Sequence, residues 1–266
     1  ILQNCIILFL FFLLCMNKII LTTVAILCVY NNVAWAQLNI EKLGYLDYGT
    51  TCLSNVWGYT QNGKEYALVG LCNGTSIVDV TDPANPAEVQ HVAGPDGIWR
   101  EIKTWQNWAF ITSQTGSIGL TIVDLSPLPD TVYTYYWKQG VLGSDTVNIT
   151  NCHALFVNEQ TGRIYLTGCD YKNKGVIMLD PSNSPQNPQV AGVYNNQYVH
   201  DCYERKDTLY TAEIYAGQFS VIDVSKPATP NVLAVQKTPD FFTHNCWLTD
   251  NGRYLFTTDE VQGAYI

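Results

Sequence analysis

One short pattern recurs four times along the chain and constrains its fold more than any other feature. An apolar run ends in an aspartate, and a turn rich in Ser, Thr and Pro follows it. The copies are 43 to 56 residues apart, and a period of this length is typical of β-propellers and solenoids rather than of a mixed α/β domain. The recurring aspartates are Asp79, Asp124, Asp180 and Asp223, separated by 45, 56 and 43 residues.

Each copy is preceded by two further apolar segments and followed by a weaker one. The polar turns QNGK, EQTGR and TDNGR between the first two segments are typical of tight hairpins, in which glycine supplies a positive φ. We therefore predict an all-β fold: a β-propeller of four-stranded antiparallel blades, incomplete, with four full blades and the start of a fifth, so that about five are present. Stacked β-sandwich modules are the alternative, but each needs about 80 to 100 residues.

The recurring aspartates have a structural interpretation. A carboxylate at this position accepts backbone N–H groups in an Asx turn, which reverses the chain before the outer strand. Direct ligand binding by these carboxylates is the alternative.

The N-terminal segment predicts export. Met16 begins a short basic stretch, an apolar run and the triplet Ala34-Trp35-Ala36, a pattern typical of a signal peptide. A transmembrane anchor is the alternative, because the preceding residues are apolar too. We expect residues 1–15 to be upstream read-through or a leader extension, residues 16–36 to be the signal peptide, and residues 37–266 to be a propeller domain truncated at its C-terminus.

Six of the nine cysteines lie beyond the leader, and an even number in an exported chain suggests disulfides. Of the three pairs that we predict, Cys52–Cys72 and Cys152–Cys169 each join the start and end of one hairpin. Cys202–Cys246 joins equivalent positions of adjacent blades. Free buried thiols are the alternative.

The segments TSIVDVTDP, LTIVDLSP and FSVIDVSKP resemble LVIVD repeats. The runs GKEYALVGLCNGTSIVDVTDPANP, WREIKTW and HNCWLTDNGRYLFTTDE, in this order, resemble the choice-of-anchor B family of bacterial surface proteins. The resemblance covers roughly residues 40–266. It implies a secreted propeller, often followed by a C-terminal sorting or anchoring tail, and it brings no established activity.

Three of the four histidines share one position of the repeat, and acidic residues recur at the end of the second strand. Antiparallel pairing predicts that these groups lie together at one mouth of the central channel. Neutral imidazole with carboxylate suits Zn, Mn or Fe, so a divalent metal is a candidate cofactor. Structural ties between blades are the alternative. The alignment matches Trp57-Gly58 to Arg100-Glu101, and the expected neighbours are His153 with Asp170, His200 with Glu213, His244 with Glu260, and Arg100 or Glu101 with Gln114.

The chain is acidic, with a formal net charge of −9, which disfavours binding to nucleic acid or to anionic membranes. No serine-hydrolase elbow, P-loop or HExxH motif is present. The leading interpretation is an exported, non-enzymatic binding or adhesion module whose partner is a protein or glycan at the bacterial cell surface. Membrane contact is expected only through the signal peptide or a C-terminal anchor. A metal-assisted hydrolase or lyase that uses the His/carboxylate ring is the alternative, and a purely structural surface protein is a third possibility.

Overall fold

The computed structural model describes residues 40–49 and 52–264. Residues Tyr45–Ile266 belong to one compact unit, and Ile40–Gly44, which lack regular secondary structure, belong to a separate N-terminal unit. The predicted signal peptide lies outside the described residues. Within the described ranges, no helix combines the length and the apolar character needed to cross a bilayer.

Antiparallel strands, each hydrogen-bonded to the next along the chain, form four sheets of four strands. Sheet 1 consists of β1 (Leu53–Gln61), β2 (Lys64–Leu71), β3 (Gly74–Asp79) and β4 (Ala87–Ala93). Sheet 2 consists of β5 (Arg100–Trp105), β6 (Trp108–Ser113), β7 (Leu120–Asp124) and β8 (Tyr133–Trp137). Sheet 3 consists of β11 (Ala154–Val157), β12 (Ile164–Thr167), β13 (Val176–Asp180) and β14 (Gln189–Tyr194). Sheet 4 consists of β15 (Asp201–Arg205), β16 (Thr208–Glu213), β17 (Gln218–Asp223) and β18 (Asn231–Lys237).

Three smaller elements complete the described fold. Hairpin 5 is formed by β19 (Thr243–Leu248) and β20 (Leu255–Asp259). A second hairpin, β9 (Gln139–Leu142) with β10 (Asp145–Asn148), follows sheet 2, and the 3-10 turn η1 (Ile214–Ala216) links β16 to β17.

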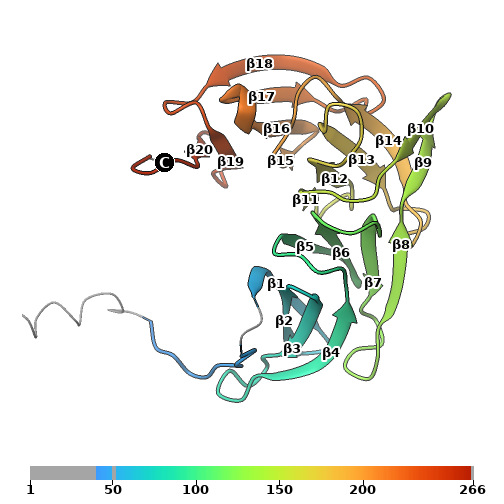
Figure 1. Ribbon diagram of the computed structural model, residues 1–266, viewed down its shortest axis with the longest axis vertical. Coiled ribbons are helices and arrows are strands. Elements are labelled where there is room, and N and C mark those ends of the chain that lie inside the picture. Colours follow the sequence, from blue (N-terminus) through green and yellow to red (C-terminus); the bar gives the residue numbers. More distant parts are fainter. Residues whose placement is uncertain (1–39, 50–51, 265–266) are drawn as a thin grey trace, which may run out of the picture. The chain divides into compact units, whose positions relative to one another are not determined.

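The sheets follow one another around an arc (Figure 1), and the first strand of each contacts the first strand of the next, in the order β1, β5, β11, β15, β19. This arrangement of four-stranded antiparallel sheets confirms the all-β, propeller-type prediction. The first strands therefore form the inner edge of the arc, where the predicted site residues lie.

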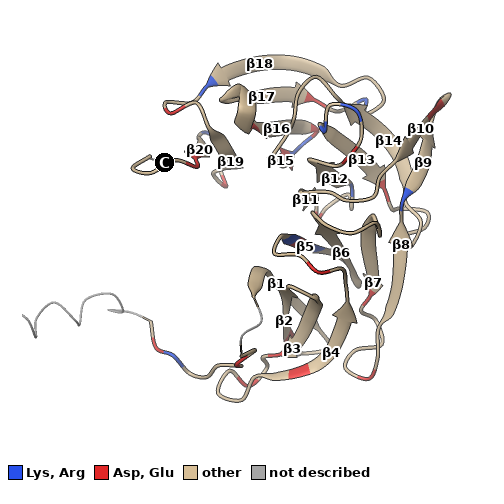
Figure 2. Ribbon diagram, in the orientation of Figure 1, with Lys and Arg blue, Asp and Glu red and all other residues tan. Residues whose placement is uncertain are grey.

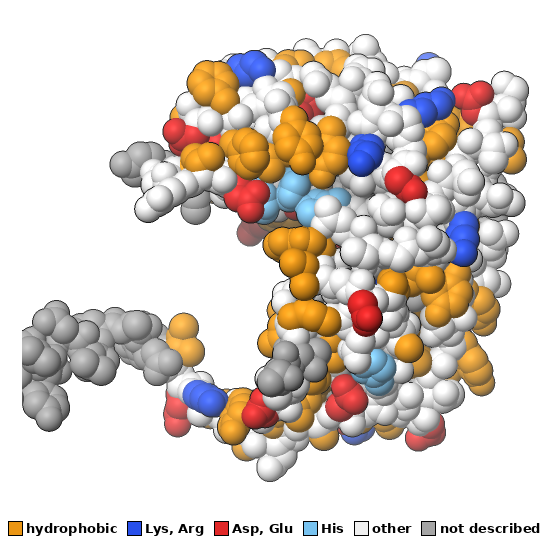
Figure 3. All heavy atoms as spheres, viewed as in Figure 1, with side chains coloured by type: hydrophobic (Ala, Val, Ile, Leu, Met, Phe, Trp, Pro, Cys, Tyr) orange, Lys and Arg blue, Asp and Glu red, His pale blue; other side chains and the backbone are white. Residues whose placement is uncertain are grey.

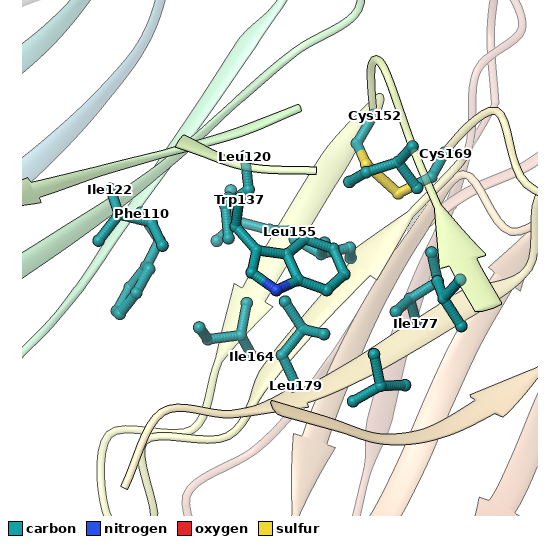
Figure 4. Close-up of a cluster of buried hydrophobic side chains, with 14 of the residues drawn as sticks. Phe110, Leu120, Ile122, Trp137, Cys152, Leu155, Ile164, Cys169, Ile177 and Leu179 are labelled. Atoms are coloured by element: carbon teal, nitrogen blue, oxygen red, sulfur yellow. A yellow bond between two sulfur atoms is a disulfide. The ribbon is translucent and has the colours of Figure 1, made fainter. Parts of the chain in front are cut away.

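The recurrent apolar motif forms the third strand of each sheet, and this strand is buried on both faces in sheets 1 to 3, whereas β17 of sheet 4 alternates buried with half-buried residues. In β7, Leu120 and Ile122 face the core shared with sheet 3, whereas Val123 faces the core shared with sheet 1. Side chains of a strand alternate between its faces, so a continuous apolar run supplies two cores at once. Figure 4 shows the core between sheets 2 and 3, where Trp137 packs among aliphatic side chains of β11, β12 and β13.

The hairpin β9–β10 was not predicted, although the sequence carries its signal. The spacing from Asp124 to Asp180 is the longest of the three, and the hairpin lies within it. Val147 of β10 is fully buried in the core between sheets 2 and 3, and β9 contacts β14. The additional residues therefore cover the outer edge of a sheet interface.

All four recurring aspartates accept a backbone N–H two residues ahead, which is the hydrogen bond of an Asx turn. The N–H donors lie 2.9 to 3.0 Å from Oδ1 of the carboxylates. Asp79 also pairs with Lys64 Nζ at 2.6 Å, and this hydrogen bond, with those from Thr81, lowers the pKa of Asp79 to about 2. The donors are Thr81 for Asp79, Ser126 for Asp124, Ser182 for Asp180 and Ser225 for Asp223.

Two of the three predicted disulfides are present. Cys52–Cys72 closes the hairpin of β1 and β2, and Cys152–Cys169 closes that of β11 and β12. Such bonds form in oxidising compartments, consistent with an extracellular environment.

The third predicted disulfide is wrong, because Cys202 and Cys246 are buried free thiols. Equivalent residues of adjacent sheets are related by a rotation, so their side chains point the same way around the arc rather than toward each other. Cys202 packs with Tyr165 of sheet 3, and Cys246 Sγ lies 3.4 Å from the carbonyl oxygen of Tyr210 in sheet 4. Each thiol therefore faces back toward the preceding sheet.

Peptide mapping of the purified chain, unfolded and alkylated without reduction, should find Cys202 and Cys246 alkylated. Before unfolding both should resist alkylation, since burial raises the pKa of the Cys202 thiol and the thiolate is the reactive form. The peptides of Cys52 and Cys72 should be linked, as should those of Cys152 and Cys169. A linked Cys202–Cys246 peptide would contradict this assignment.

Candidate functional site

The inner strands contact one another in a regular register. Asn55 Nδ2 donates to Glu101 Oε2 at 2.6 Å, and Trp57 Nε1 donates to Thr104 Oγ1 at 3.0 Å. Ser54-Asn55 is therefore the equivalent of Arg100-Glu101. The sequence alignment, which matched Trp57-Gly58 to that position, was wrong by three residues because β1 begins before its apolar part.

A cavity of about 650 Å³ lies where the inner strands begin. The residues at the shared repeat position, Arg100, His153, His200 and His244, all line it. Figure 3 shows the histidines grouped together, with a carboxylate and hydrophobic side chains beside them. Other lining residues come from the segments that lead into or out of these strands, among them Trp99, Gln114, Tyr198, Tyr215 and Glu260.

The three histidines form a ladder of tilted rings across sheets 3 and 4 and hairpin 5, with interplanar angles of 54° and 41°. Neighbouring ring centroids are 4.2 Å apart, both from His153 to His200 and from His200 to His244. His153 Nε2 lies 2.7 Å from His200 Nε2, and His200 Nδ1 lies 3.0 Å from the carbonyl oxygen of His244. The structure therefore brings these three residues together, with their rings in contact with one another, and places only His244 near a carboxylate as well, that of Glu260.

The hydrogen bonds of the ladder fix where its protons lie. A carbonyl oxygen only accepts, so His200 Nδ1 must carry a hydrogen and, in the neutral ring, His200 Nε2 must accept one from His153 Nε2. His153 Nδ1 is then an unprotonated acceptor, and this buried atom has no hydrogen-bond partner within the described residues.

Two of the three rings, those of His153 and His200, are held neutral. Burial, with a smaller contribution from the adjacent His153 and His244, lowers the pKa of His200 to about 4. Burial also lowers the pKa of His153, with His244 adding to the effect. A proton added at His200 Nε2 would turn that atom into a donor, so the contact would then require His153 to carry its hydrogen on the buried Nδ1 instead of on Nε2.

Only one of the three expected His–carboxylate neighbours is formed. His244 Nε2 lies 3.7 Å from Glu260 Oε2, as predicted. Asp170 instead accepts hydrogen bonds from the N–H of Thr150 at 2.8 Å and of Asn151 at 3.2 Å, and from the Thr150 hydroxyl. These bonds lower its pKa against the opposing effect of partial burial. Asp170 therefore holds the loop that leads into sheet 3 and does not line the cavity.

Glu213 is fully buried and does not line the cavity as predicted. Its carboxylate accepts hydrogen bonds from Tyr194 Oη at 2.7 Å, Ser220 Oγ at 2.8 Å and Gln218 Nε2 at 2.6 Å. Thr211 Oγ1 adds a fourth at 3.2 Å. Because Tyr194 ends the outer strand of sheet 3, Glu213 joins sheet 3 to sheet 4 instead of facing His200.

A one-residue register error explains why Glu213 was misplaced. Asp201 pairs with Ala212 and Asn245 pairs with Thr258, so the equivalent of Glu213 is Asp259 rather than Glu260. A shift of one residue moves a side chain to the opposite face of a strand. Asp259 plays a matching role, since it accepts hydrogen bonds from Thr238 Oγ1 at 2.5 Å and Phe242 N at 2.9 Å in the loop that leads into hairpin 5.

Arg100 and Glu101, at the start of sheet 2, also form hydrogen bonds within the protein. The buried guanidinium of Arg100 donates to the carbonyl oxygens of Leu71 at 2.7 Å and Cys72 at 3.0 Å, and to that of Pro95. Glu101 pairs with Lys103 in addition to accepting from Asn55. Elsewhere Lys and Arg are scattered over the fold (Figure 2), so the described surface has no concentrated basic patch at this site.

The sequence analysis missed a polar pair at the cavity wall. Asn245 Nδ2 donates to Asp201 Oδ2 at 2.5 Å, across the boundary between sheet 4 and hairpin 5. Burial raises the pKa of Asp201 to about 7, and the nearby charge of Glu101 contributes. The signal was available, since Asn55, Glu101, Asp201 and Asn245 each follow the shared repeat position by one residue.

The arrangement offers little to a metal. Among the described residues, no three or more His, Cys, Asp or Glu side chains are grouped so that they could hold an ion. Both ring nitrogens of His200 are occupied by hydrogen bonds, and Asp170 and Glu213 point elsewhere. The metal-assisted alternative is therefore not favoured.

Comparison with known sequences supports the repeat and leaves the larger family open. Residues 63–93 match the family model described as the LVIVD repeat. A search of curated proteins found no match to the chain.

Solved structures share the fold at low sequence identity. A functionally unknown protein from Desulfotomaculum acetoxidans aligns with a TM-score of 0.60 and 10% identity, over 83% of this chain and 68% of its own. A protein from Lactobacillus plantarum aligns with a TM-score of 0.53 and 11% identity, over 81% and 68%. The periplasmic gluconolactonase of Pseudomonas aeruginosa aligns with a TM-score of 0.52 and 9% identity, over 71% of this chain and 55% of its own length. These likenesses establish a propeller-type fold and nothing about activity.

Replacing Glu213 by Ala should lower the free energy of unfolding by about 3 kcal/mol, because buried hydroxyl and amide donors lose their acceptor. Urea unfolding followed by circular dichroism measures this difference. The matched control is Glu159→Ala, at an exposed position, which should change stability by less than about 0.5 kcal/mol. Equal stabilities for the two variants would contradict the role assigned to Glu213.

The ladder should make stability depend on pH. The folded-state pKa of His200, about 4, lies below its ordinary value of 6.5, so the unfolded chain takes up the proton first as the pH falls. Its contribution is therefore complete above about pH 6.5 and is lost between about pH 6.5 and 4. Asp201, with its pKa raised to about 7, acts in the opposite direction over the same interval.

A comparison with His200→Asn isolates the contribution of the ladder, because Asp201 is common to both proteins. The stability advantage of the wild type should shrink by about 2 kcal/mol between about pH 7.5 and 4.5, after allowance for solvent screening of a partly exposed ring. His91→Asn, on β4 outside the ladder, should leave the pH profile unchanged. Parallel pH profiles for wild type and His200→Asn would contradict the neutral ladder.

Proposed function

We propose that this chain is an exported, cell-surface-associated β-propeller that acts as a non-enzymatic binding module through the cavity at the start of its inner strands. The disulfides support an oxidising location. The resemblance to choice-of-anchor B proteins supports attachment to a bacterial surface through a C-terminal tail. A protein or a glycan at that surface is the proposed partner.

One observation carries the choice of binding over catalysis. The carboxylates that a hydrolase or lyase would need beside the imidazoles are committed to structural hydrogen bonds, as Asp170 and Glu213 show. Of the ladder nitrogens, His153 Nε2 and His200 Nε2 bond to each other, and His200 Nδ1 bonds to a backbone carbonyl oxygen. Only the pair of His244 and Glu260, 3.7 Å apart, retains the geometry of an acid–base couple.

The cavity itself supports a ligand site. A concave pocket that combines apolar walls with a few fixed polar groups is the usual form of a binding site. Its walls come from sheets 1, 2 and 4 and hairpin 5 as well as sheet 3, so the whole repeat array fixes its shape. Its only Lys or Arg side chain among the described lining residues is Arg100, which disfavours nucleic acid as the partner.

Retention on isolated bacterial cell envelopes tests this function. The purified chain should sediment with envelopes, and Gln114→Trp, which fills the cavity from an exposed position, should reduce the retained fraction at least fivefold. Gln160→Trp, on an exposed turn outside the cavity, is the matched control and should bind like the wild type.

The same assay separates the two candidate functions. Retention should be unchanged by EDTA, and elemental analysis should find no stoichiometric Zn, Mn or Fe. One metal ion per chain, lost in the double variant His153→Ala/His200→Ala, would favour the metal-assisted enzyme instead. Equal retention of Gln114→Trp and wild type would remove the cavity from the proposed function.

A further inference from the structure

Large aromatic rings stand exposed at the rim of the cavity. Trp99, just before β5, is 54% exposed, and Tyr215, in η1, is 76% exposed. Tyr215 packs against Tyr198 with ring centroids 4.8 Å apart and the two rings tilted by 41°. Exposed apolar surface at the edge of a polar cavity is costly in water and typical of a surface that receives a ligand.

The backbone that carries Tyr215 is fixed by its neighbours in the chain. Its neighbour Ile214 is buried, and the turn ends at Gly217, whose left-handed φ of 61° favours glycine. The residue that opens the turn is Glu213, fixed by four hydrogen bonds. Tyr215 is therefore exposed without being loosely attached, and a ligand that stacks on it loses little of its affinity to ordering the protein.

The floor of the cavity disfavours an anionic ligand. The Arg100 guanidinium donates to three backbone carbonyl oxygens, and the imidazoles of His153 and His200 are neutral. Among the described lining residues, therefore, no free cation faces the cavity. What remains are the amide of Gln114 and the carboxyl group of Glu260, together with the amides of Asn55 and Asn245 and the carboxyl group of Asp201, each of which already has a hydrogen-bond partner. Such groups offer donors and acceptors side by side, which matches hydroxyls, since a hydroxyl both donates and accepts.

We propose that this cavity binds a neutral saccharide, with one pyranose ring stacked on Tyr215 and its hydroxyls directed to the amide and carboxyl groups of the floor. The C–H face of a pyranose is apolar and flat, so it packs on an aromatic ring while its edge hydroxyls remain free to bond. This assignment rests on the proposed binding function and names the ligand class of the same cavity.

A cationic amine is the competing ligand class, because aromatic rings beside carboxylates also attract positive charge. Among the lining carboxylates, however, Glu101 is already paired with Lys103, and Asp201 has its pKa raised to about 7. Glu260 alone is exposed beside a histidine. The charge available to a cation is therefore small, and the saccharide is favoured.

Titration of the purified chain, followed by intrinsic fluorescence and saturation-transfer NMR, tests the assignment. The probes are glucose, galactose, N-acetylglucosamine and cellopentaose, with choline as the cationic and gluconate as the anionic comparison. At least one saccharide should bind saturably, and Tyr215→Ala should weaken it at least tenfold, whereas Tyr215→Phe should stay within about twofold because the stacking face is kept. Tyr133→Ala, which removes a ring of similar exposure on β8, is the matched control and should bind as the wild type does.

Each alternative result has a distinct meaning. Binding of choline but of no saccharide, weakened by Tyr215→Ala, would overturn the saccharide assignment and leave the binding module standing. Saccharide binding that Tyr215→Ala does not weaken would overturn the stacking site. Binding of none of the probes would overturn the saccharide assignment, while envelope retention sensitive to Gln114→Trp would still support the proposed function.

Discussion

Burial of the third strand on both of its faces is the constraint on which the rest of the structure depends. An apolar strand with two buried faces requires a sheet packed on each side, and in β7 those sides are sheet 1 and sheet 3. No single unit satisfies this requirement alone, so the repeats stabilise one another in sequence. Inner strands that lie between Leu53 and Leu248 are thereby brought into contact one after another, and residues at one repeat position become neighbours in space.

The same packing explains why carboxylates near the cavity serve structure. Each crossing from one sheet to the next leaves backbone N–H groups or hydroxyls that need acceptors at a partly buried junction. Asp170 and Asp259 accept hydrogen bonds from loop N–H groups. Glu213 accepts them from side-chain hydroxyls. The cavity lining combines imidazoles, amides and aromatic rings with the carboxyl groups of Glu101, Asp201 and Glu260.

Much of the fold could be predicted from the sequence because its signals are local and repeated. The apolar runs, the Asx turns at Asp79 and its equivalents, and the two hairpin disulfides all follow from short segments. The register between strands could not, since Glu213 and Glu260 appear equivalent until the observed pairing of Asn245 with Thr258 shifts one of them by a residue. The Cys202–Cys246 error has a different origin: sequence equivalence was taken for spatial approach, whereas rotation about the arc keeps equivalent side chains pointing the same way. The rim residues Tyr198 and Tyr215 were not predicted because they lie outside the repeated motif.

The histidine ladder links three units in a way that packing alone does not. His153 and His200 are 47 residues apart in the chain, and His200 and His244 are 44 apart, yet one line of hydrogen bonds running in one direction joins them. The tautomer of the His153 ring therefore depends on that of His200, whose Nδ1 hydrogen is fixed by the carbonyl oxygen of His244. The position of a hydrogen on a ring that precedes sheet 3 is in this way set by a backbone carbonyl in hairpin 5.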